Sequence, residues 1–246
     1  MEPPTMTDLE QPAASPLAPP QWRPLTREQR RVVGVLVEKA KTTPDAYPLT
    51  VNAITTGCNQ KNNRAPLMEL ETTEVEAALE ELRHVGGVTE LQGTGRVSKF
   101  RHNLYEWLGV DKVELAVMGE LLLRGQQTVG ELRGRAARME PIADMNELKP
   151  VLERLLAKRL IVELTPPGRG QVVTHNLYAD RELQKTREAV AAGGGIEFES
   201  EREASPPPMP AAHPSGAADL AAQFRSLQES LNQIVRRIEQ LESKLS

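Results

Sequence analysis

His102-Asn103-Leu104-Tyr105 returns 73 positions later in the chain as His175-Asn176-Leu177-Tyr178. Two further pairs of stretches match at the same offset, residues 79–82 with 152–155 and residues 88–91 with 161–164. Three matches at one offset indicate a module that has been duplicated in tandem.

Each copy has the same expected order of elements. Apolar residues recur at helical spacing in three segments and then fall in two short strand-like segments that are joined by a turn. Helix, helix, helix, strand, turn, strand is the order of a winged helix. The sequence therefore predicts an α+β protein that is mainly α with small β, built as two tandem winged-helix domains plus a C-terminal coiled-coil helix.

Composition sets the expected domain boundaries. Proline, which blocks helices and removes a backbone donor, is frequent before residue 25, and a Gly193-Gly194-Gly195 run and a Pro206-Pro207-Pro208 run follow the second copy. We expect a disordered Pro-rich N-terminus over 1–24, winged helices over 25–108 and 109–181, a flexible linker over 182–216 and a coiled-coil helix over 217–246.

Caps and turn residues place the elements within the copies. In the first copy we expect helices from Thr26 to Thr43, over 49–58 and from Thr72 or Thr73 to Gly86, and strands over 88–91 and 97–105. In the second we expect helices over 113–124, over 128–139 and from Asp144, and strands over 160–164 and 171–178.

The first helices of the two copies align at a different offset, with Gly34 matching Gly119 at 85 positions. The first copy therefore carries about twelve extra residues between its first and third helices. Insertions in a repeat often lie on its binding face, so this region is a candidate contact surface.

The C-terminal tail has a heptad pattern, because its apolar residues alternate in spacings of four and three. We expect it to self-associate, as a parallel pair, rather than to dock on the protein's own core, which would favour a wider apolar stripe. The pattern does not determine the number of strands. The expected oligomerisation residues are Leu220, Phe224, Leu227, Leu231, Ile234, Ile238, Leu241 and Leu245.

Charge and cysteine usage exclude several classes of protein. The 246 residues include 30 Lys and Arg and 34 Asp and Glu, for a net charge of −4, so the chain lacks the overall basic footprint of many nucleic-acid-binding proteins. The one cysteine, Cys58, excludes an internal disulfide and a thiolate zinc site. Since no signal peptide or membrane span is visible, we expect a cytoplasmic protein without membrane contact.

Three groups of polar residues are candidate contacts to nucleic acid or to a protein partner, because amides and cations bind phosphates and base edges. The first group is the stretch Asn59, Gln60, Lys61, Asn63 and Arg64. The second is on the first wing: Arg96, Lys99 and Arg101. The third is in the second copy: Arg133, Arg135 and Arg138 in the second helix and Arg169 in the wing turn. The alternatives are a polar loop that satisfies its own backbone and an ordinary solvated face.

The third helix, which reads the major groove in helix-turn-helix proteins, counts against DNA in the first copy. Five carboxylates surround it, those of Glu71, Glu74, Glu76, Glu80 and Glu81. The corresponding helix of the second copy has mixed charge, so any DNA contact is better placed there.

The sequence contains no phosphate-binding glycine loop, no acidic pair with metal-ligand spacing and no nucleophile beside a base. Cys58 is interpreted as a small buried residue, and the matched His102 and His175 are interpreted as structural. We therefore expect a protein that is not an enzyme and that uses no cofactor and no metal.

Several contiguous stretches resemble the YceH family of uncharacterised bacterial proteins. They are Thr42-Thr43-Pro44, Tyr47-Pro48-Leu49, Cys58-Asn59-Gln60-Lys61, Asn63-Arg64, Leu121-Leu122-Leu123-Arg124-Gly125, Gly130-Glu131-Leu132-Arg133 and Arg135-Ala136-Ala137-Arg138-Met139. The resemblance covers residues 25–180 and implies tandem winged helices. It implies no reaction, substrate or ligand.

Two hypotheses follow for the function. The first is a nucleic-acid-associated or regulatory protein that binds duplex DNA and forms a homo-oligomer through its tail. The alternative is a protein–protein scaffold whose winged helices bind a protein partner without nucleic acid. The acidic third helix favours the alternative, and the fold analogy favours the first.

Overall fold

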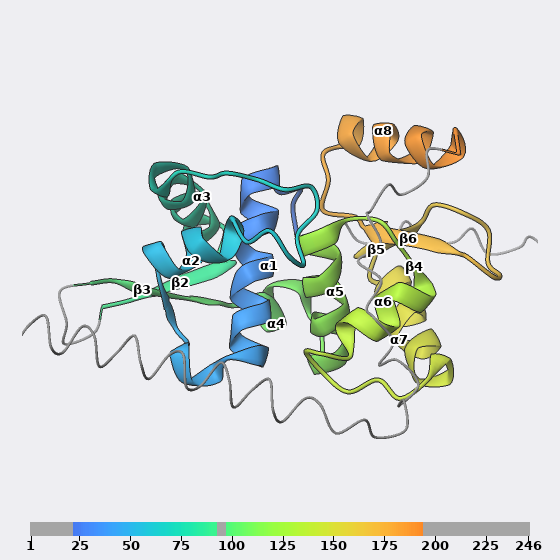
Figure 1. Cartoon of the computed structure of the whole chain (residues 1–246), viewed down its shortest axis with the longest axis horizontal. Helices are drawn as coiled ribbons and strands as arrows, with labels where there is room; N and C mark the ends of the chain where they lie inside the picture. The colour runs from blue at the N-terminus through green and yellow to red at the C-terminus, as the bar shows by residue number, and fades with distance from the viewer. Residues whose placement is uncertain (1–21, 93–96, 194–246) are drawn as a thin grey trace, which may run out of the picture. The chain divides into compact units, whose positions relative to one another are not determined.

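The computed structural model describes residues 22–92 and 97–193, which lie in one compact unit. These residues form helices and two small antiparallel sheets (Figure 1), so the predicted class, mainly α with small β, is confirmed. The expected disordered N-terminus, the tip of the first wing with Arg96 and the C-terminal heptads lie wholly or almost wholly outside the described residues. In the described part, no helix is long and apolar enough to cross a membrane.

The first repeat contains four α-helices, a short 3-10 helix and a sheet with strand order β1-β3-β2. Its elements are α1 (Arg27–Thr42), η1 (Pro44–Ala46), β1 (Leu49–Thr50), α2 (Val51–Cys58), α3 (Thr72–His84), β2 (Val88–Leu91), β3 (Lys99–His102) and α4 (Leu104–Leu108).

The second repeat has the same order and the equivalent sheet, β4-β6-β5. Its elements are α5 (Lys112–Arg124), β4 (Gln127–Thr128), α6 (Val129–Ala136), α7 (Met145–Ala157), β5 (Ile161–Glu163) and β6 (Val172–His175), and helix α8 (Asp180–Ala191) follows. Within each repeat, the order of three helices and two longer strands is the order expected of a winged helix.

Each repeat also has a two-residue strand that the sequence pattern did not predict, since two residues are too few to show an alternation. Leu49 pairs with Phe100 in the first sheet, and Gln127 pairs with Val173 in the second. Each short strand ends in a threonine, Thr50 or Thr128, whose side chain accepts a hydrogen bond from the first turn of the next helix. In each repeat the same threonine is thus the last residue of the strand and the N-cap of the following helix.

Several expected elements are corrected by the structure. The strand expected over 171–178 ends at His175, and the helix expected over 128–139 ends at Ala136. The strand expected over 97–105 ends at His102, because Leu104 and Leu108 are buried on one side of the short helix α4, which Gly109 ends in the left-handed conformation (φ 62°). Residues 182–191, expected to begin a flexible linker, belong to helix α8. None of the residues of α8 is buried, so an apolar period could not reveal it.

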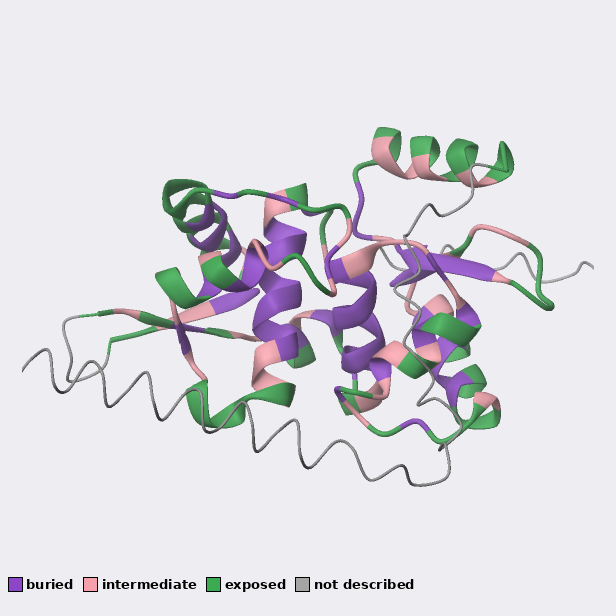
Figure 2. Cartoon of the chain, in the orientation of Figure 1, coloured by how far each residue is buried: buried purple, intermediate pink, exposed green. Residues whose placement is uncertain are grey.

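Helices α1 and α5 form the centre of the described unit. Residues 29–38 of α1 and residues 114–123 of α5 are buried without interruption, and the two windows align at the offset that matches Gly34 with Gly119. Figure 2 shows both helices buried along most of their length. The buried apolar residues of the two repeats form one continuous core around this helix pair.

The helix pair is nearly symmetric at its closest approach. A methyl group at Gly34 would lie 2.9 Å from Leu123 Cγ and 3.3 Å from Leu122 Cβ, and one at Gly119 would lie 2.7 Å from Val37 Cγ1. Val37 and Leu122 are themselves equivalent positions of the two helices. Each glycine therefore faces the same part of the other helix, as in an isologous contact between two identical subunits.

Contacts at both ends of α1 reinforce this pairing. Before the helix, the Leu25 N–H donates to the Leu177 carbonyl at 2.9 Å, and the Arg30 guanidinium lies 4.5 Å from the centre of the Tyr178 ring. At the other end, Lys41 Nζ lies 2.8 Å from a carboxylate oxygen of Glu140. The first helix of the first repeat is thus held along its length by the second repeat.

Substitution of the paired glycines tests this packing. We expect Gly34→Ala and Gly119→Ala to lower the free energy of unfolding by about 1–3 kcal/mol relative to Gly134→Ala, because they overpack a filled core. Gly134 is in helix α6, and a methyl group there meets nothing within 4 Å. Gly134→Ala should therefore stabilise the protein by up to about 1 kcal/mol through helix propensity. Urea denaturation measures all three, and equal stability of the three variants would contradict the close approach.

Candidate functional site: the polar seam between the repeats

The extra residues of the first repeat are divided between the η1 segment and the loop 59–71, which joins α2 to α3. This loop closes on itself and on the second repeat. The Asn59 side chain donates to the Leu70 carbonyl and accepts from the Leu70 N–H, both at 2.8 Å. The Ala65 N–H donates to the Leu123 carbonyl of α5 at 2.9 Å. The loop therefore covers the seam between the repeats.

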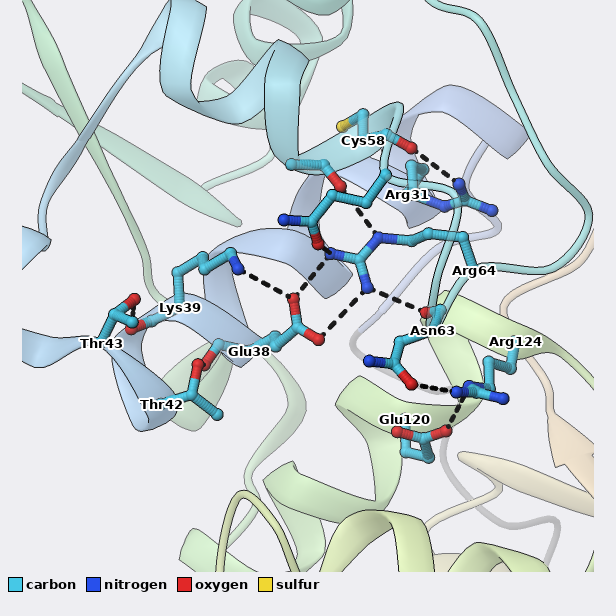
Figure 3. A network of polar contacts seen from close by, with 12 residues as sticks. Arg31, Glu38, Lys39, Thr42, Thr43, Cys58, Asn63, Arg64, Glu120 and Arg124 are labelled. Carbon is cyan, nitrogen blue, oxygen red and sulfur yellow. Dashed lines mark hydrogen bonds and ion pairs between the residues drawn. The ribbon is translucent and has the colours of Figure 1, made fainter. Parts of the chain in front are cut away.

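Arg64, expected at a contact surface, is instead buried in this loop (Figure 3). Its guanidinium makes a bidentate pair with Glu38 of α1, at 3.2 and 2.6 Å. It also donates to the carbonyls of Gly57 (2.9 Å) and Asn63 (2.8 Å) and to the Gln60 side chain (2.8 Å). A guanidinium has five N–H donors, so all are satisfied inside the protein and none is available to a phosphate.

Burial and the charge of Arg64 shift the pKa values of two neighbouring side chains, Glu38 and Arg31. Burial alone would raise the pKa of Glu38, but the hydrogen bonds and the charge of Arg64 outweigh it and hold the pKa below the usual value. Burial and the charge of Arg64 lower the pKa of Arg31 to about 10. Arg31 donates to the carbonyls of Cys58 (2.9 Å) and Pro66 (2.7 Å), which ties α1 to the end of α2 and to the middle of the 59–71 loop.

Cys58 lies at the end of α2 and is fully buried, as the sequence interpretation expected. Burial raises the pKa of its thiol to about 12, and the nearby Arg31 and Arg64 lower it only partly. Since the thiolate is the nucleophilic form, Cys58 is poorly suited to attack a substrate at neutral pH.

Glu120 of α5 is a second buried carboxylate at the seam. Its Oε1 lies 3.1 Å from Arg124 Nε, and its Oε2 lies 3.5 Å from the Arg138 guanidinium. Within residues 22–92 and 97–193, Oε1 nevertheless has no hydrogen-bond partner, because the Arg124 N–H is poorly aimed. Burial raises the pKa of Glu120, and the charges of Arg124 and Arg138 oppose this shift only in part.

Asn63 connects the two buried charge clusters. It adopts a left-handed backbone conformation (φ 60°), which asparagine tolerates better than most residues. Its side-chain oxygen accepts hydrogen bonds from Arg124 and, at 3.0 Å, from Arg138. An amide of the first repeat is thus held by two arginines of the second.

A cavity of about 520 Å³ opens beside these groups. Its walls come from α1, the 59–71 loop, α5 and the residues that follow α6. The lining residues are Glu38, Lys39, Thr42, Gln60, Lys61, Asn62, Asn63, Glu120, Arg138 and Met139.

The structure brings together part of the predicted contact set. The cavity is lined by four of them, Gln60, Lys61, Asn63 and Arg138. Arg133 and Arg135 instead donate hydrogen bonds to nearby groups of the second repeat. Arg133 donates to the carbonyls of Ile142 (3.2 Å) and Ala143 (3.1 Å), and Arg135 donates to the Gln127 side chain (2.8 Å). Lys99, Arg101 and Arg169 are exposed and apart from the cavity lining.

The matched histidines have the same role in both repeats. His102 Nδ1 accepts from the Leu104 N–H at 3.4 Å, and His175 Nδ1 accepts from the Leu177 N–H at 3.3 Å. Burial lowers the pKa of His102 to about 4 and holds that of His175 well below its usual value. Neutral imidazoles thus shape the chain at the ends of strands β3 and β6. The described residues contain no cluster of three or more His, Cys, Asp or Glu suited to a metal ion.

Sequence reasoning missed four charged residues of the seam: Arg31, Glu38, Glu120 and Arg124. A signal for two of them is visible in retrospect. Glu38 follows the apolar run that ends at Val37, and Glu120 interrupts the apolar residues of α5. Since charged groups are rarely buried without partners, a carboxylate within an all-apolar helix predicts a buried arginine beside it.

The chain is similar to proteins whose activity is not known. Residues 25–169 match the family described as "Protein of unknown function, DUF480". A UPF0502 protein of Rhodopirellula baltica is 54% identical over 162 residues, which are 66% of this chain and 68% of that protein. A UPF0502 protein of Pelobacter propionicus is 39% identical over 211 residues, which are 86% of this chain and 91% of that protein.

The buried Arg64–Glu38 pair yields a stability prediction. We expect Arg64→Ala to lower the free energy of unfolding by about 3–5 kcal/mol, because it leaves the Glu38 carboxylate buried without its partner. Lys61→Ala, in the same loop but exposed, should change it by less than about 0.5 kcal/mol. Chemical denaturation of both variants measures this, and an Arg64→Ala protein as stable as Lys61→Ala would show that the pair is not structural.

Proposed function

This chain belongs to the DUF480 family of proteins of unknown function, and we propose that it is a non-catalytic binding protein whose helix α3 docks a partner protein with a basic surface. The observation that carries the proposal is the charge of the exposed side of α3. By analogy with helix-turn-helix proteins, α3 is the element that would contact a bound macromolecule.

The exposed side of α3 bears four carboxylates, those of Glu74, Glu76, Glu80 and Glu81, and is called the acidic face below. A row of carboxylates repels a phosphate backbone and attracts lysine and arginine side chains. It therefore steers a basic protein partner toward α3 and disfavours nucleic acid.

A shallow groove of about 510 Å³ lies next to the acidic face, between the end of α3 and strand β2. Two carboxylates line it, those of Glu80 and Glu90, and Arg83 pairs with both of them. Because Arg83 already occupies the position between these carboxylates, an arginine or lysine of a partner would have to displace Arg83 to bind there. The groove gives the acidic face a recess for one anchoring side chain.

The arginines that were predicted from the sequence to contact phosphates support the same proposal. Arg64 is buried with all its donors used, and Arg133 and Arg135 donate to groups of the second repeat. Cations committed to internal contacts contribute little to an electrostatic contact surface.

Duplex DNA is the second candidate partner, and the wings favour it. Lys99 and Arg101 are exposed on β3, and Arg169 is exposed in the turn between β5 and β6. Cations on wings are well placed to contact phosphates beside a groove. This alternative makes the chain a nucleic-acid-associated regulator.

Several sequence-based expectations complete the proposal. They are the division into winged helices over 25–108 and 109–181, the absence of catalysis, the cytoplasmic location, the membership of the YceH family and the homo-oligomer formed by the C-terminal heptads. Oligomerisation would place several copies of the acidic face in one assembly. Weak individual contacts would then be strengthened through effective concentration.

Charge reversal on the acidic face tests the proposal. Full-length protein with Glu76→Lys and Glu80→Lys is compared with the wild type in affinity purification from a nuclease-treated lysate of the source cells. We expect the wild type to retain a protein partner in stoichiometric amount, and the reversed variant to bind that partner at least about tenfold more weakly, because like charges then face each other.

The matched control is Glu106→Lys with Glu153→Lys, which makes the same charge change at exposed positions outside α3. It should bind the partner as the wild type does. Equal loss in the control and in the acidic-face variant would contradict a specific role of α3. Binding that is found only when the nuclease is omitted, with a Lys99→Ala/Arg101→Ala/Arg169→Ala variant defective for duplex DNA, would favour the second candidate instead.

A further inference from the structure

The cavity at the seam is formed by residues of both repeats, and its lining includes Glu120, a buried carboxylate that makes ion pairs but accepts no hydrogen bond within the described residues. We propose that this cavity binds a small organic phosphate that also carries a hydroxyl or amino group. The phosphate would be held by the cations at the cavity, and the hydroxyl or amino group would donate to Glu120.

The charge of the lining favours an anion. Three cationic side chains line the cavity, those of Lys39, Lys61 and Arg138. The two lining carboxylates are each opposed by an arginine from behind, Glu38 by Arg64 and Glu120 by Arg124. The positive charge therefore exceeds the negative charge around the cavity. A phosphate group, with several acceptor oxygens, suits a guanidinium and two ammonium groups together.

Lys61 makes the fewest contacts of these three cations in the part of the chain that the structure describes. Within the described ranges it makes no ion pair or side-chain hydrogen bond, whereas Lys39 Nζ lies 3.7 Å from Glu38 Oε2 and Arg138 contacts Asn63 and Glu120. Lys61 is also exposed, so it loses little hydration before it meets a ligand. A cation without a partner at the mouth of a polar cavity is placed to bind an incoming anion.

Glu120 supplies the second point of recognition. Its side chain is 2% exposed, and neither carboxylate oxygen accepts a hydrogen bond within the described ranges. Oε1 is enclosed beside Arg124, whereas Oε2 lies 3.5 Å from the guanidinium of Arg138, which also lines the cavity, so Oε2 is the oxygen that a ligand would meet. A buried acceptor left without a donor costs about 1–3 kcal/mol, so a donor from a ligand would relieve an existing deficit. The raised pKa of Glu120 agrees with a carboxylate that is incompletely stabilised by its surroundings.

The size of the cavity decides between a small molecule and a macromolecule. Its volume of about 520 Å³ falls within the range of small-molecule sites, about 300–1,000 Å³. The Glu120 side chain that lines it is almost wholly buried, out of reach of a phosphate on the backbone of a duplex. The occupant is therefore a free small molecule.

Calorimetric titration of the full-length protein tests both points of recognition. The probes are glycerol 3-phosphate and 2-aminoethyl phosphate, which carry both groups, with inorganic phosphate and glycerol as single-group controls. We expect at least one of the two-group probes to bind about tenfold or more tightly than inorganic phosphate, which is the gain from one charge-assisted hydrogen bond. Glycerol alone should not bind measurably.

Two variants assign the roles, with a third as the control. Lys61→Ala should weaken every phosphate probe about tenfold, because one charge-assisted contact is lost. Glu120→Gln should reduce the advantage of the two-group probe over inorganic phosphate while phosphate itself still binds. Lys185→Ala, at an exposed lysine of α8 outside the cavity lining, should bind all probes as the wild type does.

Thermal unfolding without probes confirms that each variant is folded before its titration. The proposal is overturned if neither two-group probe binds more tightly than inorganic phosphate, or if Lys61→Ala binds as the wild type does. It is also overturned if Lys185→Ala is weakened as much as Lys61→Ala, since that would be unspecific charge attraction. None of these variants changes the acidic face of α3, so the partner-protein experiment is decided separately.

Discussion

Helices α1 and α5 approach closely at Gly34 and Gly119, and the rest of the described structure is arranged around this contact. Both helices are buried on all sides over ten residues, a pattern that requires neighbours in every direction. Each helix packs against its own repeat on one side and against the other repeat on the opposite side. The duplicated modules therefore share one core.

The close packing of the two helices also explains the polar seam. Glu38 and Glu120 lie within the buried windows of α1 and α5, so the fold places both carboxylates of the seam away from water. Buried charges must be paired, and the 59–71 loop supplies Arg64 for Glu38 and the Asn63 amide for the arginines beside Glu120. Glu120 remains incompletely satisfied, and the cavity lies beside it. The proposed binding cavity thus lies at the edge of the shared core.

The sequence predicts what depends on periodicity and caps, and less of what depends on contacts between distant residues. The duplication, the three helices of each repeat, the wing strands and the cap at Asp144 follow from local patterns. Arg64 could not be placed, because an arginine in a polar loop has the same local pattern whether it faces solvent or a buried glutamate. Helix α8 was missed because it buries no residue, and α4 because five residues are too few for a helical period.

Hydrogen exchange of the native protein, followed by mass spectrometry of peptides, tests the shared core most directly. If the two repeats form one cooperative unit, the slowest amides of α1 and α5 will open with the same free energy, close to that of global unfolding. The amides of helices α3 and α7, which pack on α1 and α5, will then also open together. Exchange of the second repeat at a distinctly lower free energy, while the first stays protected, would show that the repeats fold independently and would contradict the account.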